Sequence, residues 1–281
     1  MSGRVRFSLG DPVALCLEEK RDRAPAYPTA SIQKGITLWH KHTDLSEEGV
    51  GFGLPVMKRG RRTIYPGSVR MSVEDCGDLI RLKALYNMNI GETLYLKGKP
   101  ARRRAFDLVN EWFSMLHRRH PALRAVIDRG GIGLRSALRI ERKFEEAVSC
   151  GEAAVEYEID AGRRTISVGV DLRQCGFDRG ARIFMMNELG ANHFDQYRDS
   201  RGFRLKGEAI GTWEEVRAGE ATFLDSVHSL SFTLPKVGGA GMFRGRELVP
   251  GKLAWAGLAH ALRARAESFR YTIIIKDEAP R

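Results

Sequence analysis

The chain lacks most of the short motifs that identify a reaction. Its 281 residues contain no GxSxG nucleophile elbow, no HExxH zinc helix and no complete dinucleotide-binding fingerprint. A glycine-rich stretch, RGGIGLR at 129–135, has the flexibility of a phosphate-binding turn but lacks the GKS/T ending of a P-loop. The function therefore has to be inferred from the fold and from scattered polar residues.

Cysteines and long apolar runs are also scarce. The four cysteines form no CxxC pair, which argues against a compact cysteine zinc site and favours free thiols in a reducing compartment. No apolar run approaches the ~20 residues that span a bilayer. Gly10, Asp11 and Pro12 interrupt the apolar stretch near the N-terminus, so it does not read as a signal peptide. We therefore expect a cytoplasmic protein.

What the chain does contain is a series of segments typical of strands. Apolar and polar residues alternate, or β-branched and aromatic residues gather, at 4–9, 36–42, 51–56, 63–71, 79–86, 92–97, 153–159, 165–172, 181–186, 203–205, 227–234, 253–262 and 269–275. Glycine-containing turns join several of them into hairpins. The pattern predicts a mainly β fold, a large antiparallel β-sandwich.

One region breaks this pattern. Ala105, Val109, Trp112 and Leu116 follow helical spacing, so we expect a helical insert around residues 102–128. No Pro/Ser-rich linker appears, so we expect one domain that spans residues 1–281. The alternative is two β-rich halves, 1–100 and 140–281, joined by a basic insert at 101–139.

The net charge of +11 favours anionic partners, and most of it lies in this insert. Residues 97–143 hold thirteen Lys or Arg against four acidic residues. Arg102, Arg103 and Arg104 stand at the start of the expected helix, where cations oppose the helix dipole, so they are candidates for anion binding. The alternative is a solvated basic helix face.

Two histidines lie close together in GITLWHKHTDLSEE. If 36–42 is one strand, His40 and His42 share a face with their Cβ atoms about 7 Å apart, since a strand rises ~3.3 Å per residue. Such a pair suits a divalent metal with a third ligand. The spacing of Gly35, His40, His42, Glu47 and Gly53 resembles the first metal motif of cupins, although the stretch YPGSVRM has no histidine for a second motif. The alternative is a pair of hydrogen-bonded surface or cleft histidines.

A second polar group occupies NELGANHFDQYRDSRG at 187–202. We expect a surface loop whose carboxylates, amides and aromatic rings suit sugar hydroxyls and apolar sugar faces, or else a loop held by its own turns and ion pairs. His228 shares a predicted strand face with Leu230 and Phe232, so it faces either the core or a ligand cleft.

Large antiparallel sandwiches of this length resemble the galactose-mutarotase-like supersandwich. That resemblance implies a site on a concave sheet and a role as an epimerase, a polysaccharide lyase or a glycan-binding module, although a fold does not determine a function. The leading hypothesis is accordingly a carbohydrate-directed protein, an isomerase/epimerase or lyase for an acidic or phosphorylated sugar, that needs no cofactor.

The residues of this hypothesis fall into two groups. The acid–base candidates are His40, His42, His193 and His228, and the ligand-binding candidates are Trp39, Glu188, Asp195 and Arg198. The alternatives are a metal-dependent enzyme that binds a divalent ion through His40 and His42, and a non-enzymatic protein that binds nucleic acid with the basic insert. The nucleic-acid alternative predicts affinity that falls steeply with salt.

Overall fold

The computed structural model describes residues 3–19, 31–59, 62–77, 79–96, 99–100, 115, 130, 140–176, 181–249, 253–262 and 266–278. Apart from Met115, the predicted helical insert at 102–128 lies outside these residues, and so does the Arg102–Arg104 triplet. Among the described residues, no helix combines the length and hydropathy that crossing a bilayer requires.

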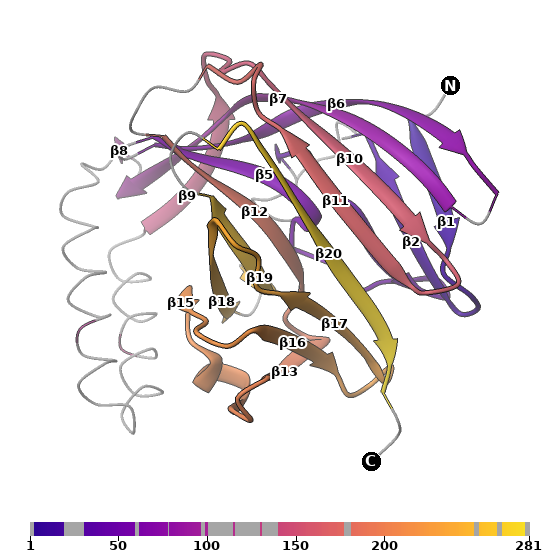
Figure 1. Cartoon of the computed structure of the whole chain (residues 1–281). Coiled ribbons are helices and arrows are strands. Elements are labelled where there is room, and N and C mark those ends of the chain that lie inside the picture. The colour runs from indigo at the N-terminus through magenta and orange to yellow at the C-terminus, as the bar shows by residue number, and fades with distance from the viewer. Residues whose placement is uncertain are drawn as a thin grey trace.

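Most of the described chain forms one continuous antiparallel sheet of 16 strands (Figure 1). In spatial order its main path runs β14 (Arg204–Lys206), β13 (Phe194–Asp199), β16 (Glu220–Asp225), β17 (Leu230–Pro235), β20 (Ser268–Asp277), β11 (Thr165–Asp171), β10 (Glu152–Asp160), β7 (Leu79–Leu96), β6 (Arg62–Asp75), β5 (Gly51–Arg59), β12 (Ala181–Gly190), β19 (Leu253–Leu262), β18 (Ala240–Val249) and β15 (Glu214–Glu215). The short strands β8 (Lys99–Pro100) and β9 (Ile140–Glu146) pair with β7. The prediction of a mainly β, antiparallel sandwich is confirmed.

A second sheet of four strands packs against this large one. It comprises β1 (Arg4–Ser8), β2 (Val13–Glu18), β3 (Thr37–His40) and β4 (Thr43–Asp44). Ile36 and Phe52 exchange backbone hydrogen bonds of 3.0 and 2.7 Å, which tie the start of β3 to β5. Gly35 permits this approach, because a Cβ there would fall inside contact distance of the Phe52 carbonyl oxygen. The small sheet is therefore fixed against the large one just before His40.

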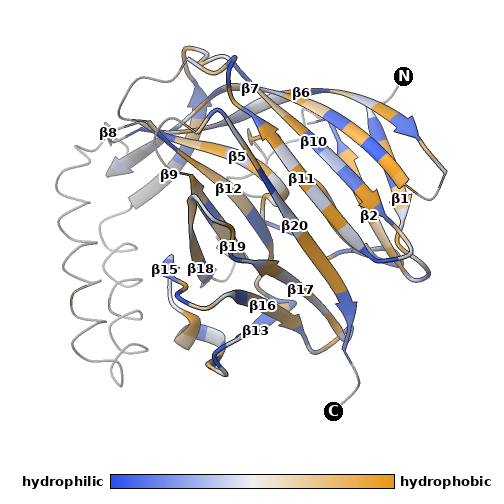
Figure 2. Cartoon of the chain, viewed as in Figure 1, coloured by the Kyte–Doolittle hydropathy of each residue, from blue (hydrophilic) through white to orange (hydrophobic). Residues whose placement is uncertain are grey.

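The core follows from the alternation seen in the sequence. Along β10, Ala153, Val155, Tyr157 and Ile159 are buried, while the residues between them are half-exposed. The same alternation is visible as bands of colour on β10 and β11 in Figure 2. Buried side chains of both sheets join one hydrophobic cluster, in which Phe232 contacts the rings of Phe52, Phe194 and Phe223.

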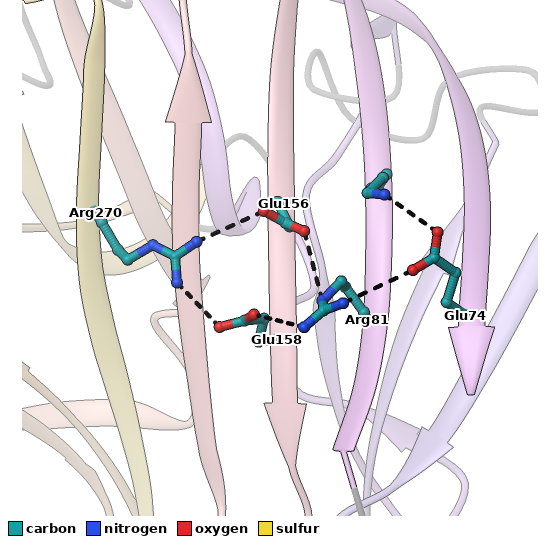
Figure 3. A network of polar contacts seen from close by, with 6 residues as sticks. Glu74, Arg81, Glu156, Glu158 and Arg270 are labelled. Carbon is teal, nitrogen blue, oxygen red and sulfur yellow. Dashed lines mark hydrogen bonds and ion pairs between the residues drawn. The ribbon is translucent and has the colours of Figure 1, made fainter. Parts of the chain in front are cut away.

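The half-exposed face of β10 carries a network of ion pairs (Figure 3). Arg270 on β20 reaches Glu158 at 3.0 Å and Glu156 at 3.6 Å, and Arg81 on β7 contacts the same two carboxylates at 3.3 and 3.6 Å. Arg270 pairs in register with Gly169 on the intervening strand β11, and the missing side chain leaves room for the guanidinium to cross. The two arginines and the two glutamates compensate one another within this network.

Several predicted boundaries are wrong. The expected strands 79–86 and 92–97 are parts of the single strand β7, and two register shifts near Pro66 let β6 follow it. The expected surface loop at 187–202 consists mainly of the end of β12 and the whole of β13. Strands from before residue 100 pair directly with strands from after residue 140, β7 with β10 and β5 with β12, and the division into domains stays a prediction.

Candidate histidine–carboxylate site

Three histidines from separate segments of the chain meet at the end of the small sheet. His228 is central: its ring centroid lies 4.7 Å from that of His40 and 5.2 Å from that of His193. The side chains of His193 and His228 are 14% and 16% exposed, so solvent reaches an edge of each ring. We call these three residues, together with Glu47 and Asp225, the histidine cluster.

Asp225, the last residue of β16, organises the turn that carries His228. Its Oδ1 accepts the backbone N–H groups of Val227 at 2.8 Å and His228 at 3.2 Å, an arrangement that ends the strand and closes the turn. Its Oδ2 lies 2.6 Å from His228 Nδ1. Because the Asp225 side chain is fully buried, this contact is a strong constraint on the His228 ring, as in the carboxylate–imidazole pairs of acid–base sites.

His193 lies in the turn between β12 and β13 and has carboxylates on two sides. Its Nδ1 is 4.0 Å from Asp225 Oδ2, and its Nε2 is 3.1 Å from Glu47 Oε1. The Glu47 oxygen is close enough for an ion pair, but its direction does not suit a hydrogen bond. The buried Nε2 of His193 therefore has no hydrogen bond. Asn192 donates to Glu47 Oε2 at 2.9 Å, and a Cβ at Gly190 would stand 2.7 Å from that oxygen. Glycine at 190 therefore allows Glu47 to reach the cluster.

A largely buried lysine supports the loop that carries Glu47. Lys34 donates through Nζ to the Glu47 backbone oxygen, while Glu47 itself adopts a left-handed φ of 40°. Burial lowers the pKa of Lys34, and the nearby carboxylates, first Asp44 and then Glu48 and Glu188, oppose that shift. The Lys34 side chain thus holds the backbone of this loop through its hydrogen bond to Glu47.

His40 and His42 do not share a strand face. The strand β3 ends at His40, and Lys41, with φ of 56°, and His42 form the turn into β4. The prediction of a strand through His42 is wrong, because the left-handed Lys41 reverses the chain before the alternation reaches that residue. His42 is exposed. Burial is the main cause of the lowered pKa of His40, and the neighbouring His228 contributes to it.

Among the described residues, one group of side chains has the spacing of metal ligands. It comprises His193, Asp225 and His228, whose ligand atoms lie within 4.8 Å of one another. The structure thus brings together three of the four histidines singled out in the sequence, and the expected His40/His42 pair is not the group with ligand spacing.

The predicted sugar-binding residues are dispersed. Trp39 is covered by the guanidinium groups of Arg4 and Arg6, 5.4 and 5.6 Å from its ring centroid. Glu188 is buried in β12. Asp195 lies in β13, 3.8 Å from Lys206 Nζ, with Oδ1 buried and lacking a hydrogen bond.

Arg198 lines a separate surface cavity. It pairs with Glu278 at 2.7 Å and borders a cavity of about 220 Å³ between β13, β14 and β16. The other lining residues are Gln196, Tyr197, Arg204, Leu205, Lys206 and Leu224. Gln196 pairs in register with Leu224 and Lys206, which places these three side chains on one face of the sheet. Asp225 follows Leu224 along β16 and points to the opposite face, toward the core.

Sequence reasoning missed Asp225 and also misplaced His228. The expected strand at 227–234 begins only at Leu230, and His228 lies in the preceding turn. The stretch Asp-Ser-Val-His at 225–228 is typical of a turn that begins with an aspartate. An Asp at the end of a strand commonly accepts hydrogen bonds from the backbone N–H groups two and three residues further along the chain. Here these hydrogen bonds bring the side chain of His228, three residues after Asp225, back to the carboxylate.

Comparisons with known proteins identify structures with a similar fold but no family to which the chain belongs. No family model matches the chain, and no curated protein matches it. Among solved structures, the α-N-acetylgalactosaminidase NagBb from Bifidobacterium bifidum in its Gal-NHAc-DNJ complex matches with a TM-score of 0.51 at 10% identity, over 98% of this chain and 36% of that one. A quadruple mutant of NagBb matches with the same TM-score, 0.51, at 9% identity and with the same shares of 98% and 36%.

A third solved structure matches too weakly to support an argument. The GH36 α-galactosidase AgaB from Geobacillus stearothermophilus reaches a TM-score of 0.33 at 10% identity, over 92% of this chain and 30% of that one. The chain thus spans about a third of the length of the structures it matches, and the likeness to NagBb establishes a shared fold alone.

Proposed function

We propose that the chain is a carbohydrate-directed protein whose histidine cluster transfers protons on an acidic or phosphorylated sugar, as an isomerase/epimerase or a lyase. The observation that carries the proposal is the approach of His193 and His228 to the buried carboxylate of Asp225, with the His40 ring against that of His228. The sandwich shared with a glycosidase, NagBb, supports the sugar as substrate class. The net charge of +11 favours an acidic one.

The chemistry requires a base that removes a proton and an acid that returns one. Asp225 Oδ2 accepts from His228 Nδ1, which leaves Nε2 of the same ring to exchange protons with a ligand. His40, close to His228 and with a lowered pKa, is a neutral base near pH 7. Glu47, with a side chain 30% exposed, supplies a carboxylate at the opposite side of His193.

The test is proton exchange on the sugar itself. The purified chain is incubated in D₂O with uronic acids and sugar phosphates, and deuterium incorporation at carbon is followed by NMR. We expect His228→Ala to slow exchange by about a hundredfold or more, the lower end of what a general acid–base group contributes. Glu215→Gln, an exposed carboxylate in β15, is the matched control for Asp225→Asn.

Two results would contradict the proposal. One is the absence of both exchange and binding across the panel, with binding followed by thermal shift. The other is exchange that persists in His228→Ala and Asp225→Asn. Nucleic-acid binding by the basic insert at 101–139 stays a prediction, since all of the insert except Met115 and Gly130 lies outside the described residues.

A further inference from the structure

We propose that His193, Asp225 and His228 form a site for a divalent transition-metal ion of the zinc type. The ligand atoms are Nδ1 of each histidine and Oδ2 of the aspartate. This inference concerns the same cluster as the proposed function and holds whether or not the chain acts on a sugar.

The distances need only a small adjustment to hold such an ion. Bonds of about 2.0 Å at tetrahedral angles separate ligand atoms by about 3.3 Å. Here Asp225 Oδ2 lies 2.6 Å from His228 Nδ1 and 4.0 Å from His193 Nδ1. One ligand atom from each of the three residues, a ring nitrogen for each histidine, can be chosen so that all lie within 4.8 Å of one another. Shifts of about 1.5 Å or less, within the reach of side-chain torsions in turns, close the set around one ion.

The surrounding groups orient the ligands in the way that metal sites require. Asp225 Oδ1 is occupied by the backbone N–H groups of Val227 and His228, which leaves Oδ2 directed into the cluster. On the far side of the His193 ring, Glu47 lies 3.1 Å from Nε2. A carboxylate there draws the imidazole proton to Nε2 and frees the Nδ1 lone pair for a metal. The buried Nε2 lacks a hydrogen bond as it stands, and a slight rotation toward Glu47 supplies one.

The ligand types select the metal. Two imidazoles and one carboxylate suit zinc, iron(II), manganese or nickel, whereas magnesium and calcium prefer oxygen alone. Three protein ligands leave at least one coordination position open for water or a ligand, the arrangement of reactive metal sites. Binding displaces the proton between His228 Nδ1 and Asp225 Oδ2, which passes to solvent. His40 and Glu47 stay outside the ligand set and remain available to a substrate.

The test uses the full, tag-free chain, stripped with EDTA and titrated with Zn²⁺ by calorimetry. Co²⁺ is the spectroscopic probe, since tetrahedral coordination by nitrogen and oxygen gives visible absorbance. We expect one ion per chain, by elemental analysis after gel filtration. His193→Ala should abolish stoichiometric binding. Glu47→Gln should weaken it by about ten- to a hundredfold, the usual cost of losing a carboxylate behind a metal-bound imidazole.

Two further variants keep the result interpretable. Asp225→Asn retains an oxygen for the turn N–H groups and loses the anionic ligand, so circular dichroism should show a folded protein without the site. His42→Ala removes an exposed histidine next to the cluster and should bind Zn²⁺ like the unaltered chain.

The proposal is overturned if the unaltered chain takes up no ion, if binding survives in His193→Ala and Asp225→Asn, or if His42→Ala loses it. The outcome is separable from the proposed function. Sugar exchange by EDTA-stripped chain that binds no Zn²⁺ would leave the sugar proposal standing and refute this one.

Discussion

A buried histidine in β19 leads to a quantitative prediction about stability. His260 is completely buried, and neither of its ring nitrogens has a hydrogen-bond partner among the described residues. Its ring packs against Tyr271 at 4.9 Å and Phe269 at 5.4 Å between centroids. Burial alone lowers the pKa of His260 to about 4 from the usual 6.5.

This shift fixes the sign and the size of the pH dependence. The folded-state pKa lies below the unfolded value, so between pH 6.5 and pH 4 the unfolded chain binds the extra proton and the folded chain does not. Stability is therefore lost as the pH falls through this window. At about pH 5 the unfolded imidazole is almost fully protonated and the folded one about one-tenth, which corresponds to a loss of about 2 kcal/mol relative to pH 7.

The matched variant is His260→Leu, which fills a similar volume with a group that does not titrate. At pH 7 we expect it to unfold with a free energy equal to or above that of the unaltered chain, because it removes two buried nitrogens that lack partners. Between pH 7 and pH 5 the unaltered chain should lose about 2 kcal/mol more than the variant, a melting temperature difference of about 5 °C.

The assay is urea unfolding followed by tryptophan fluorescence at pH 7, 6 and 5. Comparing the two proteins cancels the other titrating groups, since these are common to both. Parallel loss of stability in the two proteins between pH 7 and pH 5 would refute the reasoning. It would mean that His260 is solvated or bonded in the folded state.

Three other changes test the packing. Asn187→Ala removes a fully buried amide whose Oδ1 accepts two hydrogen bonds, so we expect a loss of about 2–4 kcal/mol in urea unfolding. Gly35→Ala drives a Cβ into the carbonyl oxygen of Phe52, and we expect a melting temperature lower by about 5 °C or more. Arg270→Ala breaks two partly exposed ion pairs (Figure 3) and should cost less than about 1 kcal/mol, with even less in roughly 0.5 M salt, by the same unfolding assay.

The mainly β fold could be predicted because each strand has a recognisable pattern within its own few residues. A half-buried antiparallel strand must alternate, and the residues of β10 and β11 alternate without a break. The expected strand at 253–262 coincides with β19, and the hairpin between 153–159 and 165–172 is present as the β10–β11 pair. The order of the strands in the sheet was not predictable, because pairs such as β5 with β12 join segments far apart in the chain.

The errors at the histidines arise where a turn is made by residues other than glycine or proline. Lys41 and Ser229 adopt left-handed φ values of 56° and 54°, although neither residue type favours this conformation. In the sequence, both sites look like continuations of alternating strands. The histidines that the alternation assigned to strands, His42 and His228, therefore lie in turns instead.

These turns also explain why the candidate site forms where it does. His40 directly precedes Lys41, His228 directly precedes Ser229, and Glu47 has its own left-handed φ of 40°. Non-glycine residues in this conformation cost about 1 kcal/mol or more each. Glycine would remove that cost at any of the three positions. The need for a tight turn therefore does not explain why lysine, glutamate and serine occupy them. Such strain persists where surrounding contacts hold the backbone in place, and these three turns meet at the histidine cluster around the buried Asp225, either in direct contact with it or through His228 and His193.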